Sequence, residues 1–131
     1  MAIKVVLDTN ILVSALLNEN GKPHQIVELF YDKVISVYYG QDIIDEYKDV
    51  LSRKEFDITP AKIGKIINAI RRIGIYSEPI QSVFEMKDET DRTFYDTAKS
   101  TGAWLITGNI KHYPVEPFII TVSDFCEKFN V

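Results

Sequence analysis

One carboxylate and one amide lie at the ends of segments that we expect to be strands, and a second carboxylate lies at the start of a helix that precedes one of them. Asp8 ends an apolar run over residues 3–7, and Asn109 follows a second run over residues 103–107. Asp91 begins the helix that leads into this second run. In an open parallel sheet, ligands bind beyond the carboxyl ends of the strands. We therefore expect Asp8, Asp91 and Asn109 to meet at one edge of a sheet, although they are far apart in the sequence.

Glu46 is a further candidate, carried by a helix expected over residues 42–51. At about 100° per residue, the apolar side chains of this helix form one arc. Glu46 lies at the flank of that arc, from which its side chain can bend over the sheet edge towards Asp8. The arc consists of Ile43, Ile44, Tyr47, Val50 and Leu51.

Asp8, Glu46 and Asp91 would repel one another if the fold gathers them. Each ionised carboxylate raises the pKa of its neighbours, and folding has to bear that cost. A divalent cation removes the cost, and oxygen ligands of this kind suit Mg²⁺ or Mn²⁺ rather than zinc. Such an ion can polarise a phosphate and lower the pKa of a water that it binds. The sequence therefore predicts a metal site that acts on phosphate esters.

Each acid also has a structural interpretation. Asp8 and Asp91 are good helix N-caps, and Asp88 or Glu89 could take that place instead of Asp91. Glu46 could be an ordinary residue at the boundary of an amphipathic helix. The constellation as a whole favours the functional interpretation.

Other polar residues do not form a rival site. Asp96 lies nearly opposite the apolar arc of its helix, so periodicity predicts that its side chain is exposed. We expect His24 to be exposed at a helix start and His112 to lie in a surface loop, from which it could approach a phosphate. A basic helix face could contact RNA or an acidic partner, or could simply be solvated. It consists of Lys62, Lys65, Arg71 and Arg72, near Arg53 and Lys54.

Apolar runs and helical periodicities alternate along the chain. Helices fill the intervals between the runs, and Ser123 is the expected cap of the last helix. Strands that alternate with helices imply a parallel sheet with helices on both faces. The expected strands cover residues 3–7, 34–39, 75–76, 103–107 and 118–120.

Composition limits the class of protein. The 131 residues, 46% of them hydrophobic, suit one globular domain over residues 1–131. Cys126 is the only cysteine, which excludes an internal disulfide and a cysteine-based zinc site. No apolar run is long enough to cross a bilayer and no secretion signal is visible, so we expect a cytoplasmic protein with no membrane partner. The net charge of −4 argues against a broad positive surface for nucleic acid, but not against a nuclease.

Four pieces of the sequence, in this order and spacing, resemble a PIN domain of the small bacterial or archaeal kind that includes VapC-like toxins. They are residues 5–10, Glu46, residues 91–98 and residues 105–109. The resemblance covers nearly the whole chain. It implies a three-layer α/β/α fold with a central five-stranded parallel sheet.

The resemblance also implies a function. The chain would be an endoribonuclease that depends on Mg²⁺ or Mn²⁺, with Asp8, Glu46 and Asp91 as its acidic triad. Members of the family often have a fourth acid where this chain has Asn109, which adds no charge and leaves open whether one or two metal ions bind. Many relatives are toxins neutralised by an antitoxin protein, and many form homodimers.

Two other functions remain open. Phosphoryl transfer through an aspartyl phosphate would use Asp8, but haloacid-dehalogenase-like enzymes carry a second Asp where this chain has Asn10. Receiver domains carry an acidic pair after the first strand, and here only Asp8 is present. A catalytically weak binding module that acts through a partner protein is the other alternative, which the neutral Asn109 keeps open.

Overall fold

Five parallel strands form the sheet at the centre of the molecule. The computed structural model describes residues 1–83 and 85–131. The strand order is β3-β2-β1-β4-β5, which confirms the predicted five-stranded parallel sheet. The strands are β1 (Ile3–Leu7), β2 (Ile35–Tyr39), β3 (Ile75–Tyr76), β4 (Trp104–Ile106) and β5 (Ile119–Ile120).

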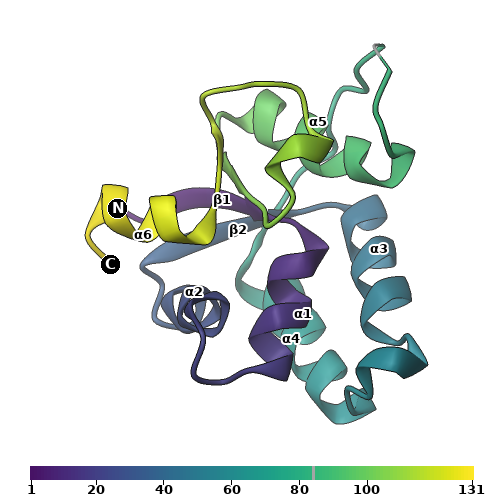
Figure 1. The fold of residues 1–131 in the computed structure, drawn as a ribbon, viewed down its shortest axis with the longest axis vertical. Coiled ribbons are helices and arrows are strands. Elements are labelled where there is room, and N and C mark those ends of the chain that lie inside the picture. The colour runs from purple at the N-terminus through teal and green to yellow at the C-terminus, as the bar shows by residue number, and fades with distance from the viewer. Residues whose placement is uncertain (84) are drawn as a thin grey trace.

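Helices cover both faces of this sheet, which gives the predicted three layers (Figure 1). α5 (Arg92–Thr101) lies above the sheet in this view, whereas α1 (Thr9–Leu17), α2 (Lys22–Tyr31) and α4 (Pro60–Ile73) lie below it. The remaining helices are α3 (Gln41–Leu51) and α6 (Val122–Phe129). The chain also contains three short 3-10 helices, η1 (Lys54–Phe56), η2 (Glu89–Asp91) and η3 (Ile110–His112). No described helix is long and apolar enough to span a membrane.

The core lies between these layers, and the central strands are buried on both faces. Val5, Val6 and Leu7 of β1 are at most 1% exposed, as are Leu105 and Ile106 of β4. A continuous run of branched apolar residues is the usual sequence of a strand that is covered on both sides. The apolar runs of the sequence therefore predicted the strands because both faces of this sheet need apolar side chains.

β1 is the strand at which the order of the sheet reverses. The chain runs outward from β1 to β2 and β3, and then returns to add β4 on the other side of β1. Leu7 pairs with Ile106, and the Asp8 N–H donates to the Ile106 carbonyl at 3.0 Å. The carboxyl ends of β1 and β4 therefore lie side by side, at the switch point where open α/β sheets bind ligands.

The last helix is capped two residues earlier than predicted. The Thr121 hydroxyl, not that of Ser123, accepts a hydrogen bond from the Asp124 N–H at 3.1 Å. Ser123 already lies in the first turn of α6, because the helix begins at Val122. Both residues are good caps, so residue type alone did not decide between them.

Candidate active site

Asp8 is a buried carboxylate at the carboxyl end of β1. The residue is only 6% exposed to solvent. Oδ2 accepts hydrogen bonds from the Thr107 hydroxyl at 2.7 Å, the Tyr113 hydroxyl at 2.9 Å and the Asn10 amide at 3.4 Å. Burial raises the pKa of Asp8, and the bonds from Thr107 and Tyr113 partly offset that rise.

The capping interpretation of Asp8 is wrong for its side chain. Asp8 precedes α1, but the described structure has no side-chain capping bond from it to that helix. The carboxylate instead turns towards the end of β4, which supplies Thr107. Thr107 also accepts a bond from the Asn109 N–H at 2.9 Å, and Asn10 accepts one from the Gly108 N–H at 3.0 Å. The loop after β4 is thereby tied to the start of α1.

Tyr47 fixes the position of the neighbouring Glu46. Its hydroxyl donates to the Leu7 carbonyl at 2.6 Å, and its ring lies 5.9 Å from the ring of Phe94. Tyr47 therefore links α3 to the end of β1 and to α5. This packing holds half-buried Glu46 close enough to Asp8 for the two charges to interact.

Glu46 has a raised pKa, as expected of a carboxyl among other carboxyls. Burial is the largest cause, and the charge of Asp49 follows. Asp88 and Asp8 raise the pKa further, whereas Arg53 lowers it. Asp8 is the smallest of these contributions, and it shows that Glu46 lies near enough to the Asp8 carboxylate to interact with it.

Asp91 is the least satisfied of the three carboxylates. Its side chain is 13% exposed, and its Oδ2 is buried without a hydrogen-bond partner among the described residues. Burial, followed by the charges of Asp8 and Asp88, raises its pKa to about 6. Asp91 takes the N-cap position of α5 without a side-chain capping bond, and Asp88 caps the preceding turn η2, where it accepts from the Thr90 N–H at 3.0 Å and from its hydroxyl at 2.8 Å. The Asp91 carboxylate is therefore available for a ligand.

The loop after β4 brings His112 and Asn109 to the same edge. His112 is half exposed, as a loop residue should be, but its Nδ1 lies 3.6 Å from Oδ2 of Asp91. Asn109 lies just past β4, as predicted, and its side chain is exposed. Both residues can reach a ligand that approaches the carboxylates from solvent.

The donor set fits a hard divalent cation. Asp8, Glu46 and Asp91 offer oxygen atoms only, and a cation would neutralise the unpaired Oδ2 of Asp91. Within residues 1–83 and 85–131, no three His, Cys, Asp or Glu side chains form a ready-made metal group. Mg²⁺ commonly needs none, because one or two carboxylates hold it together with waters and phosphates. The three acids therefore fit by ligand type and leave room for substrate.

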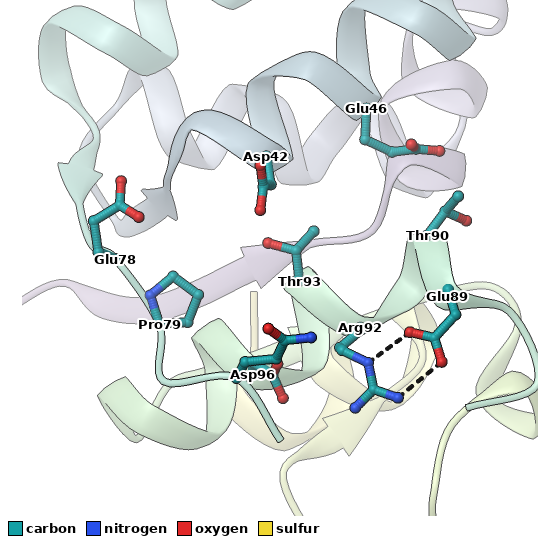
Figure 2. Close-up of a pocket in the computed structure, with 10 residues that line it drawn as sticks. Asp42, Glu46, Glu78, Pro79, Glu89, Thr90, Arg92, Thr93 and Asp96 are labelled. Atoms are coloured by element: carbon teal, nitrogen blue, oxygen red, sulfur yellow. Dashed lines mark hydrogen bonds and ion pairs between the residues drawn. The ribbon is translucent and has the colours of Figure 1, made fainter. Parts of the chain in front are cut away.

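A hollow of about 340 Å³ borders the site through Glu46 (Figure 2). Most of its polar side chains are acidic. Arg92 also lies there, and it pairs with Glu89 at 2.7 Å. The acids of this hollow are Asp42, Glu46, Glu78, Glu89 and Asp96.

Asp96 is buried, contrary to the prediction from helical periodicity. It is 4% exposed, and its Oδ2 accepts from the Ser82 N–H at 3.1 Å. Arg92 holds the same serine, donating to its carbonyl at 2.9 Å and to its hydroxyl at 2.6 Å. The chain after β3 thus crosses the outer face of α5. Periodicity describes only the helix itself and does not detect a segment that packs over it.

The basic face of α4 lies away from these carboxylates. Lys62 and Lys65 are exposed and line a separate hollow of about 140 Å³ with His24 and Glu28. His24 is half-buried rather than exposed: Nδ1 lies 3.2 Å from the Ala15 carbonyl, and Nε2 lies 3.1 Å from Glu28. No residue of this hollow belongs to the candidate site.

Three site residues were not identified from the sequence. Asn10 was considered only as a departure from the aspartyl-phosphate enzymes, although it bridges Asp8 and the Gly108 N–H. Thr107 did carry a signal, because it ends the strand that neighbours β1. Tyr113 carried none, since nothing in its loop sequence indicates that its hydroxyl turns inward to Asp8.

The fold and the site define an α/β/α domain with an acidic centre at the switch point of a parallel sheet. Comparison with known families identifies it further. The model of the PIN domain family matches residues 4–111, so the chain belongs to the PIN domain family. PIN domains are generally nucleases, and the family generally uses divalent metal ions.

A relative from Methanocaldococcus jannaschii, named "Uncharacterized protein MJ1680", is 32% identical over 110 residues. The match covers 82% of this chain and 71% of the relative. Its name states no activity. His112 and Tyr113 lie just beyond the residues that match the family model.

The Tyr113 hydroxyl should matter for metal binding. We expect Tyr113→Phe to weaken Mn²⁺ affinity, measured by titration calorimetry, by about 10-fold, because outer-shell bonds orient metal ligands. Tyr95→Phe is the matched control, since it removes a buried hydroxyl that contacts Lys99 rather than a site carboxylate. Equal Mn²⁺ affinities of the Tyr113→Phe variant and the wild type would contradict this role.

Ionised Asp91 should destabilise the metal-free protein. Its folded pKa of about 6 exceeds the ordinary 3.8, so ionisation costs stability above about pH 6 and not below about pH 4. In EDTA, urea unfolding should therefore show Asp91→Asn more stable than the wild type by about 1–3 kcal/mol at pH 8. The gain should shrink as the pH falls to 4. A gain independent of pH would point to packing instead.

Proposed function

We propose that this protein is a metal-dependent endoribonuclease that hydrolyses RNA phosphodiesters. The observation that carries the proposal is the buried Oδ2 of Asp91, which accepts no hydrogen bond among the described residues and interacts electrostatically with Asp8 and Glu46 at the switch point. An acidic centre of this kind lowers the stability of the folded protein unless a cation and a ligand occupy it. Membership of a generally nucleolytic family supports hydrolysis as the reaction.

Asp8, Glu46 and Asp91 would hold Mg²⁺ or Mn²⁺, which supplies electrophilic assistance to phosphodiester hydrolysis. Thr107, Tyr113 and Asn10 fix one oxygen of Asp8, so the carboxylate does not have to be oriented when the ion binds. We propose that Asn109 is a neutral fourth residue of the site, beside the three acids, and that its amide orients a water or the phosphate. Its lack of charge favours tight binding of one ion over two.

RNA is proposed as the substrate because the site is open at the sheet edge. Glu46 is half-buried, and Asn109 and His112 are exposed, so a flexible strand can bring a phosphate to the carboxylates. Single-stranded or looped RNA offers such a strand.

The wider biological role is also a proposal. We infer that residues 1–131 act as one nuclease domain, because all five strands share one sheet and one core. By likeness to small PIN domains, the protein would act in the cytoplasm as the toxin of a toxin–antitoxin pair. It would be neutralised by an antitoxin protein and would form a homodimer.

Cleavage of RNA should require both the ion and Asp8. We expect purified protein to cleave an end-labelled RNA of mixed sequence in Mn²⁺ or Mg²⁺, and EDTA to abolish cleavage. Asp8→Asn should lower the cleavage rate by at least about 100-fold, since even outer-shell changes cost 10- to 100-fold. Lys62→Ala, on the remote face of α4, should cleave like the wild type.

Two results would count against the proposal. Cleavage that survives Asp8→Asn would mean a contaminating nuclease or a different site. A folded protein that binds Mn²⁺ but cleaves no RNA would favour a binding module that acts through a partner protein.

A further inference from the structure

A second hollow of about 340 Å³ borders the carboxylates, on the side of His112 and Tyr113. Two separate segments, one before η2 and one after β4, form its walls. Its lining touches the site directly, because Tyr113 bonds to Asp8 and His112 lies beside Asp91. The lining residues are Glu85, Met86, Lys87, His112, Tyr113 and Pro114.

The hollow beside Glu46 is a poor place for a nucleic-acid backbone. Besides Glu46, four carboxylates line it, and its one guanidinium, that of Arg92, is bonded to Glu89 and Ser82. A phosphate placed there would meet like charges at short range, and the remaining polar groups of the lining, those of Gln81, Thr90 and Thr93, are neutral. We therefore expect an RNA strand whose phosphate lies at the acidic centre to continue along a different surface.

The hollow beside His112 has the groups that such a path needs. Lys87 is exposed and offers a cation, while half-exposed His112 can donate to a phosphate oxygen through Nε2 when that nitrogen carries a hydrogen. Met86 and Pro114 add apolar surface between them, and Glu85 is the only carboxylate of the lining. Its volume lies within the range of pockets that hold small ligands.

We propose that the hollow formed by residues 85–87 and 112–114 is a nucleotide subsite. It binds the RNA nucleotide next to the phosphate held at the acidic centre, with Lys87 and His112 contacting the adjoining phosphate. This inference rests on the proposed ribonuclease function and adds the direction in which the strand leaves the site. The basic face of α4 is the rival surface, and it does not border the carboxylates.

Binding of a fluorescent single-stranded RNA 12-mer tests the subsite in an Asp8→Asn background with Mg²⁺, where cleavage is prevented. Lys87→Ala and His112→Ala should each weaken binding by about 3- to 10-fold. Lys87→Ala should also lower the slope of log affinity against log salt by about 0.7, the value for one phosphate contact on a single strand. Lys62→Ala removes the same charge from α4 and should change neither quantity. Thermal unfolding checks that all variants are folded.

Crosslinking locates the strand independently. RNA that contains 4-thiouridine, irradiated on the same Asp8→Asn protein, should attach to peptides that contain residues 85–87 or 112–114. Crosslinks confined to α4, together with weaker RNA binding by Lys62→Ala, would overturn the proposal. Unchanged binding by both Lys87→Ala and His112→Ala would overturn it as well.

The subsite and the ribonuclease proposal can fail separately. If the wild type cleaves RNA while Lys87→Ala and His112→Ala bind RNA normally, the subsite fails and the nuclease stands. If both variants bind weakly while the wild type cleaves nothing, the hollow binds RNA and the proposed activity fails.

Discussion

Mutual repulsion of carboxylates at the end of β1 is the constraint around which the site is built. Burial is the largest cause of the raised pKa of both Glu46 and Asp91, and the charge of Asp8 raises both further. Three side chains donate hydrogen bonds to Asp8, whereas the buried Oδ2 of Asp91 accepts none among the described residues and has only His112 nearby, at 3.6 Å. The Asp91 carboxylate thus costs stability when it is ionised, which is typical of functional sites.

The contacts that pack the core of this fold also position the carboxylates of the site. Reversal of strand order at β1 brings the ends of β1 and β4 together, and the registered pair Leu7 and Ile106 sets Asp8 beside Thr107. Tyr47 then ties α3 to Leu7 and packs on Phe94 of α5. Glu46 and Asp91 thereby hold their places through buried neighbours, so a core change near Tyr47 would reach the carboxylates.

The sequence predicted the features of the fold and site that follow from a local pattern of apolar residues. The apolar run before Asp8 and the position of Glu46 beside the buried arc of α3 follow from burial on a sheet or helix. Long-range contacts were not predictable in this way. Asp96 was placed in solvent because no helical pattern reveals that Ser82 packs over α5, and the bond from Tyr113 to Asp8 joins residues that only the finished fold brings together.

Locating the ion would test the central claim most directly. Crystals of the wild-type protein soaked in Mn²⁺ should show one strong anomalous peak within ligand distance of carboxylate oxygens of Asp8 and Asp91, with Glu46 facing it directly or through water. The peak should be absent from Asp91→Asn crystals soaked in parallel. A wild-type site empty at millimolar Mn²⁺, or a peak that persists unchanged in Asp91→Asn, would contradict the account.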